Sequence, residues 1–291
     1  MRRLLPLLFL AAACGSAHAS PGGRQQVLAA AYPFAWAADR VGGSDVRVVN
    51  LVKPGTEPHD VELAPRQVGA VEQAALVVYL HGFQAAVDDA VRNAPAGRRL
   101  DLGPVVHVKP LSSDLKDENG SGIDPHVWLD PVRMTAIVDA VAERLAAGDP
   151  AHAAGYSSRA QQADRQLAEL DRLFRSQLRS CARHDIVTAH TAFAYLSARY
   201  GLHQVGVTGL SPDAEPAPGH VAKVARYARA HGVTTVFFES RIDPKLAQTV
   251  AGEVGARTAV LDPVEGVRAG DDYLSVMRRN AVALHEGLGC S

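Results

Sequence analysis

The chain has 291 residues, of which 47% are hydrophobic and 21% are charged, and its formal net charge at pH 7 is -1. This composition excludes intrinsic disorder and leaves enough chain for two domain-sized cores. The near balance of acidic and basic residues argues against a nucleic-acid partner, because such proteins present a clear excess of Lys and Arg.

Residues 1–19 are expected to be an export signal. Arg2 and Arg3 precede an apolar run, and the sequence Ala-His-Ala that ends at Ala19 fits a small-x-small cleavage site. The segment "LAAACGS" also resembles a bacterial lipoprotein cleavage box, in which Cys14 would be lipidated, so both routes remain open. Either route predicts an exported protein, periplasmic or anchored on the outer face of the cytoplasmic membrane. No later segment is long and apolar enough to span a bilayer.

Short β-branched apolar runs alternate with longer Ala-rich helical stretches along the rest of the chain. The runs are "VRVVNLV", "ALVVYL" and "VVHV" in the first part and "DIVTAH", "TTVFFES" and "TAVLDP" in the second. This alternation predicts an α/β fold with mostly parallel sheets. Two such lobes that face each other across a cleft are expected to bind a ligand between them, at the carboxyl ends of their strands.

Residues 149–180 contain no strand-like run, and their apolar residues recur at helical spacing: Leu167, Leu170, Leu173, Phe174 and Leu178. We therefore expect one long helix that begins at Asp149 and Pro150. The predicted organisation is a signal peptide at 1–19, an α/β lobe at 24–148, a rigid linking helix at 149–180 and a second α/β lobe at 181–291.

Three of the twelve histidines follow a predicted strand or precede a helix, in loops that could orient an imidazole. His59 lies in the proline-rich turn "KPGTEPHD", His126 in "DPHVWLDP" and His190 at the end of "IVTAH". Each alone would be interpreted as a surface-loop or capping residue. Three neutral imidazoles together with one carboxylate, however, form the tetrahedral N/O set that Zn²⁺ favours, so they predict a zinc site.

Asp262, which ends the predicted strand in "TAVLDPVEG", is the expected carboxylate ligand, and Glu239, which ends "TTVFFES", is the competing candidate. An Asp before Pro at the end of a strand is also a frequent turn former. We expect His59 and His126 to form a half-site on the first lobe. His190 and Asp262 of the second lobe would complete it as the cleft closes.

Cysteine pairing has two possible outcomes. An exported chain usually pairs its cysteines, and a disulfide between Cys181 and Cys290 would fasten the terminal helix to the second lobe. The alternative is two separate thiols.

Five ordered motifs, from about Val27 to Leu288, resemble the metal-binding solute receptors of bacterial ABC uptake transporters, specifically the zinc branch. These motifs are "PGTEPHDVELAP", "DPHVWLDP", "HTAFAYLSARYGL", "GLSPDAEPAPGHVAKV" and "VFFESRIDPKLAQTVAGEVGARTAVLDPVEG". The resemblance implies two α/β lobes, one rigid helix and a metal held between the lobes. It assigns ligand roles to His59, His126 and His190, with Asp262 or a water molecule in the fourth position.

The resemblance also implies the metal and the partners. Manganese and iron relatives generally place a Glu where this chain has His190, and imidazoles favour Zn²⁺ whereas carboxylates favour Mn²⁺. The chain departs from some zinc receptors at Pro58, where they have a Glu. The expected protein is a monomer without enzymatic activity, which delivers Zn²⁺ to a membrane permease with a cytoplasmic ATPase.

Three alternatives remain open from the sequence. The first is a receptor for manganese or another divalent metal. The second is a secreted zinc hydrolase with three histidine ligands and Asp262 as general base, although the chain has no H-E-x-x-H pair. The third is an adhesin that uses the same fold.

Overall fold

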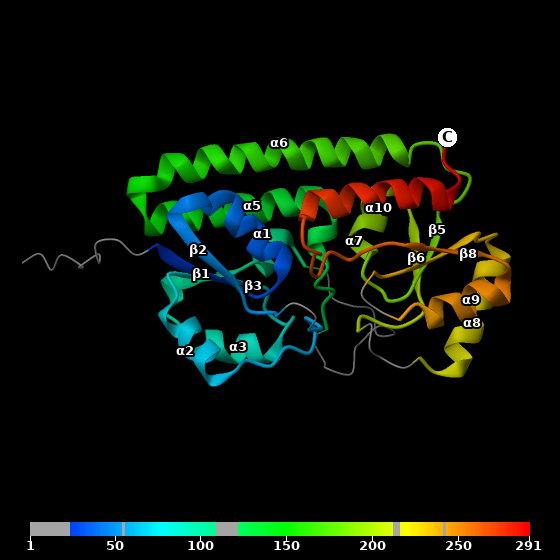
Figure 1. Cartoon of the computed structure of the whole chain (residues 1–291), viewed down its shortest axis with the longest axis horizontal. Coiled ribbons are helices and arrows are strands. Elements are labelled where there is room, and N and C mark those ends of the chain that lie inside the picture. Colours follow the sequence, from blue (N-terminus) through cyan, green and yellow to red (C-terminus); the bar gives the residue numbers. More distant parts are fainter. Residues whose placement is uncertain (1–23, 54–55, 109–121, 212–215, 241–242) are drawn as a thin grey trace, which may run out of the picture.

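The computed structural model describes residues 24–53, 56–108, 122–211, 216–240 and 243–291 (Figure 1). The expected export signal and Cys14 lie outside these residues. Within them, no helix is long and apolar enough to cross a membrane.

Two four-stranded parallel sheets organise the chain, with the strand orders β2-β1-β3-β4 and β6-β5-β7-β8. Because every pair is parallel, the carboxyl ends of all four strands lie at one edge of each sheet. The strands are β1 Gln25–Ala29, β2 Val46–Asn50, β3 Leu76–Tyr79, β4 Arg99–Asp101, β5 Asp185–Thr188, β6 His203–Gly206, β7 Thr235–Phe238 and β8 Arg257–Val260.

Helices alternate with these strands in both halves of the chain. Several begin with proline in the first turn, where its missing N–H costs no hydrogen bond. The helices are α1 Tyr32–Gly42, α2 Pro65–Gln73, α3 Ala85–Val91, α4 Gly103–Val106, α5 Pro131–Gly148, α6 Ala153–Gln177, α7 Ala194–Tyr200, α8 Pro218–Ala230, α9 Lys245–Val254 and α10 Tyr273–Leu288.

The 25-residue helix α6 runs along one side of the molecule, above α5 and α10, and spans both lobes (Figure 1). Its length is roughly 37 Å at the usual rise per residue. The first turn of the expected helix is instead a 3₁₀ turn, Pro150–His152. The Asp149 carboxylate contacts the side chains of His152 and Tyr156 there. The predicted fold class, two α/β lobes joined by one long helix, is confirmed; the exact lobe boundaries stay a prediction.

One continuous apolar core connects the two lobes. It extends from the first sheet through α1, α5, α6 and α10 to the inner face of the second sheet, where Ile186 and Phe237 belong to it. Their strand neighbours Val187 and Val236 point to the opposite face and form a smaller core under α8 and α9. Because the lobes share apolar packing through the long helices, their relative motion is expected to be limited.

A disulfide joins Cys181 to Cys290, which are 109 positions apart in the chain, so the predicted pairing is confirmed. Two backbone hydrogen bonds flank it, from Ala182 N to Gly289 O at 3.2 Å and from Ser291 N to Ser180 O at 3.0 Å. The bond fastens the end of α10 to the start of the second lobe. For a loop of this length, the chain-entropy model gives a stabilisation of about 4–5 kcal/mol.

Candidate metal site

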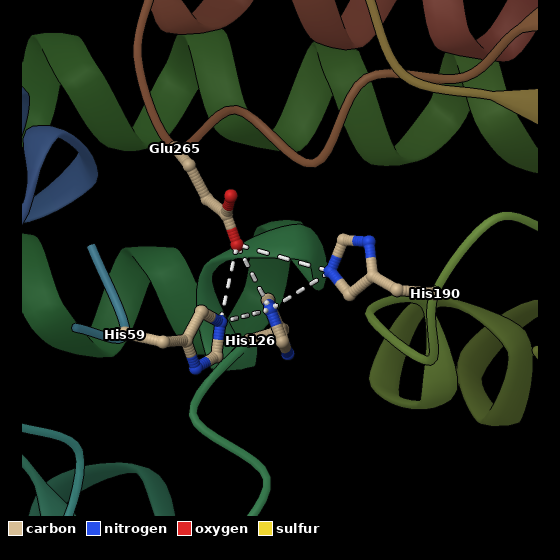
Figure 2. Close-up of side chains that lie close together, drawn as sticks. All are labelled: His59, His126, His190 and Glu265. Atoms are coloured by element: carbon tan, nitrogen blue, oxygen red, sulfur yellow. Dashed lines mark hydrogen bonds and ion pairs between the residues drawn. The ribbon is translucent and has the colours of Figure 1, made fainter. Parts of the chain in front are cut away.

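Four side chains from distant parts of the chain converge on one point between the lobes (Figure 2). His59, His126, His190 and Glu265 each offer one ligand atom, and these atoms all lie within 4.8 Å of one another. Among the residues that the structure describes, no other group of three or more His, Cys, Asp or Glu side chains meets this criterion.

The three histidines come from three different connections. His59 follows β2, His126 precedes the 3₁₀ turn Val127–Leu129 that leads into α5, and His190 follows β5. Two buried or half-buried glutamine amides fix the neighbouring backbone. Gln84 Nε2 donates to Pro58 O at 2.7 Å, and Gln204 Nε2 donates to His190 O at 3.1 Å. These two side chains therefore fix the backbone at or next to His59 and His190 without a metal.

The distances between the ligand atoms fit a single tetrahedral ion. The Nε2 of His126 lies 3.3 Å from that of His59 and 3.5 Å from that of His190. The Oε1 of Glu265 lies 3.1 Å from His126, 3.4 Å from His59 and 3.9 Å from His190. A zinc ion with bonds of about 2.0–2.1 Å places its ligands about 3.4 Å apart in a regular tetrahedron. Five of the six distances thus lie near the tetrahedral value, and the sixth, between His59 and His190, is at most 4.8 Å, so the four residues can close around one Zn²⁺.

Two further buried carboxylates orient the imidazoles from behind. Asp124 Oδ1 lies 2.8 Å from Nδ1 of His126, and Glu239 Oε1 is in hydrogen-bonding contact with Nδ1 of His190. An imidazole that donates its Nδ1–H to a carboxylate directs the lone pair of Nε2 to the opposite side, toward the centre of the cluster. Glu239, the competing candidate for the fourth ligand, thus supports His190 instead.

Burial and charge set the protonation of the cluster. Burial lowers the pKa of His59, so its ring is neutral near pH 7. Burial opposes charge on His126 too, but the hydrogen bonds and charges of Asp124 and Glu265 outweigh it and raise the pKa of His126 to about 10. Burial alone would raise the pKa of Glu265, whereas its contacts with His126 and His59 hold it well below its usual range. Before a metal binds, a doubly protonated His126 can bridge two carboxylates.

Asp262 is not one of the four converging residues. Its carboxylate accepts hydrogen bonds from Ser240 Oγ at 2.5 Å and from the backbone N of Val264 at 2.8 Å. It therefore shapes the turn after β8, and Glu265, three residues further on, places its carboxylate among the three histidines. From the sequence, Asp262 is the expected ligand because it is the first acidic residue after the predicted strand. The Asp-Pro turn in "LDPVEG", with a second and longer acid beyond it, was the available signal.

A comparison with protein families identifies the chain's relatives. The model described as "Zinc-uptake complex component A periplasmic" matches residues 27–287. The chain belongs to this family.

Individual members of this family are similar over most of the chain. The high-affinity zinc uptake system protein ZnuA of Bacillus subtilis is 30% identical, with 96% of this chain and 94% of the relative covered. The zinc-binding protein AdcA of Streptococcus pyogenes is 31% identical over 90% of this chain. The crystal structure of Zn(II)-bound AdcA from Streptococcus pneumoniae has a TM-score of 0.78 at 28% identity and covers 91% of this chain and 58% of that chain.

This chain spans about half the length of the AdcA relatives, since the match covers 56% of the Streptococcus pyogenes protein. The ZnuA relative, in contrast, is matched over almost its whole length.

Exchange of Glu265 for Gln should weaken zinc binding by more than 100-fold, because it removes the charged ligand, and even residues that only support a ligand typically contribute about 10- to 100-fold. The matched control is Asp262→Asn, which keeps an oxygen that can accept from Val264 and should change the affinity by less than about threefold. Competition with a chromophoric chelator measures both. An equal loss of zinc affinity in the two variants would indicate that Asp262 is a ligand.

Zinc affinity should rise with pH between 6 and 8. The pKa of His126 is about 10, so near neutral pH zinc must displace a proton from its Nε2. Each displaced proton changes the apparent affinity by about tenfold per pH unit. Calorimetry in two buffers with different ionisation enthalpies should show release of about one proton per zinc at pH 7. An affinity that is constant over this range, without proton release, would contradict a protonated His126 in the metal-free protein.

Proposed function

We propose that this protein is an extracytoplasmic receptor that binds Zn²⁺ with high affinity and delivers it to an ABC importer. The convergence of three imidazole nitrogens and one carboxylate oxygen between the lobes supports this proposal most directly. Three neutral ligands and the Glu265 carboxylate give Zn²⁺ a site of net charge +1, which Asp124 and Glu239 further compensate.

The donor set favours zinc over manganese. Mn²⁺ prefers oxygen donors and a higher coordination number, whereas three imidazoles and one carboxylate suit a four-coordinate ion. His190 is central to this preference, since it supplies the third nitrogen. Selectivity against Cu²⁺ must come from geometry and metal supply, because Cu²⁺ binds most nitrogen sites more tightly than Zn²⁺ does.

The same geometry favours a receptor over a zinc hydrolase. A catalytic zinc keeps three protein ligands and an open position for water. Here Glu265 supplies a fourth protein ligand at the centre, and Asp262, the residue that would act as general base, is engaged with Ser240 and Val264. A receptor requires only binding and release.

Partners and location follow from the family. The description of the family as a periplasmic component of a zinc-uptake complex supports an exported protein that docks on a membrane permease with a cytoplasmic ATPase. We propose that it acts as a monomer and contacts the membrane only through the permease or through a lipid on Cys14. The shared apolar core favours release by a small shift between the lobes over a wide opening.

Competitive titration of the metal-free protein with Zn²⁺ and Mn²⁺ tests the proposed function. The wild type should bind one Zn²⁺ and prefer it to Mn²⁺, and His190→Ala should lose at least about 100-fold in zinc affinity, because one of four ligands is missing. His81→Ala is the control, since His81 is exposed and lies outside the cluster. A wild type that prefers Mn²⁺, or a His190 variant with unchanged affinity, would refute the assignment.

A further inference from the structure

Glu265 lies in the connection between β8 and α10, and this connection is fastened to the first lobe. Pro263, two residues before Glu265, accepts a hydrogen bond through its carbonyl oxygen from the indole Nε1 of Trp128 at 2.7 Å. At the far end of the connection, Arg40 of α1 pairs with Asp272 at 2.5 Å. Although Glu265 follows the last strand of the second sheet, its position thus depends on contacts with the first lobe.

Trp128 is itself held rigidly next to a ligand. It lies two residues after His126, is fully buried, and its ring centroid is 5.3 Å from the imidazole of His126. Phe34 and Phe83 pack against the indole at 5.7 and 5.9 Å. The hydroxyl of Tyr273, the first residue of α10, donates to the Trp128 carbonyl oxygen at 2.6 Å. The indole N–H and the backbone carbonyl of Trp128 therefore bind residues on both sides of Glu265 in the chain, Pro263 before it and Tyr273 after it.

The segment needs such support because its local backbone is unfavourable. Val264, between Pro263 and Glu265, is fully buried and has a φ of 60°, in the left-handed region that β-branched residues avoid. Its N–H is bound by Asp262, which fixes one side of the turn. The hydrogen bond from Trp128 fixes the other side. The turn so held brings Glu265 to 3.1 Å from His126, closer than to either of the other two histidines.

The chain's other tryptophan provides a natural comparison. Trp36 of α1 is also buried, with 4% of its surface exposed, and packs against Tyr273 at 4.8 Å. Its Nε1, in contrast, has no hydrogen-bond partner among the described residues. Exchange of either tryptophan for Phe shortens a buried aromatic side chain, but only the exchange at Trp128 removes a hydrogen bond.

We propose that Trp128 is a positioning residue for zinc binding, which acts through Glu265 by holding the Pro263 carbonyl. This inference rests on the proposed function. The proposed role makes His59, His126 and Glu265 a preformed set of three ligands, because the first lobe holds the connection that carries Glu265, and His190 is then the one ligand held by the second lobe alone. The sequence predicts two ligands from each lobe. The proposed arrangement instead has three ligands held by the first lobe and one held by the second.

A double-mutant cycle tests this role, with zinc affinity measured by chelator competition for the wild type, Trp128→Phe, Glu265→Gln and the double variant. Trp128→Phe should weaken zinc binding by roughly three- to tenfold, the effect expected for one buried hydrogen bond. In the Glu265→Gln background it should cause no further loss, because the residue through which it acts is gone. Trp36→Phe should leave the affinity unchanged.

Thermal unfolding of each variant without zinc separates affinity from folding. If Trp128→Phe does not fold, incorporation of benzothienylalanine in place of tryptophan takes its place in the cycle, since it keeps the size and shape of the ring but lacks the indole N–H that binds Pro263, and Trp36 has no such bond to lose. An equal loss of affinity in both backgrounds, or none in either, would overturn the positioning role while the proposed function stands. A wild type that binds no zinc would refute the proposed function and this role together.

Discussion

The structure depends on one electrostatic constraint: a buried carboxylate and three buried imidazole nitrogens face one another, at distances of 3.1–3.9 Å for the pairs that include His126 or Glu265. Lone pairs that converge in a low-dielectric interior repel one another unless a cation or protons lie among them. The pKa of His126 is raised and that of Glu265 is lowered, because a proton on His126 and a charged Glu265 carboxylate stabilise each other in this interior. A divalent ion would satisfy the constraint more completely, because it would attract all four atoms at once.

The positions of the four side chains follow from a fold in which two similar sheets face a common space. The two sheets have the same parallel strand order, and the connections after β2, β5 and β8 bring His59, His190 and Glu265 to the space between the lobes. The long helices α5, α6 and α10 connect the lobes through a shared core, and the Cys181–Cys290 disulfide fastens the end of the last helix. A scaffold of this kind can hold ligands from four distant segments within a few ångströms and still allow a small shift of one of them.

Much of this architecture could be predicted from the sequence, because hydrophobic periodicity indicates strands and helices, and because three histidines in loops next to predicted elements together form a nitrogen-rich donor set. His59, His126 and His190 were accessible in this way. The carboxylate was not, because the choice between Asp262 and Glu265 depends on which side chain the turn after β8 directs inward. That direction follows from the hydrogen bonds of Asp262 to Ser240 and Val264, which are tertiary contacts. The supporting role of Glu239 likewise depends on its distance from His190 in space.

The most direct test of the four-ligand site is the crystal structure of the zinc-loaded protein, with the metal located by anomalous scattering at the zinc edge. We predict one zinc ion bound by Nε2 of His59, His126 and His190 and by a carboxylate oxygen of Glu265, at about 2.0–2.2 Å from each. Zinc at another place, or zinc between the lobes with Asp262 or Glu239 in the fourth position, would contradict this prediction.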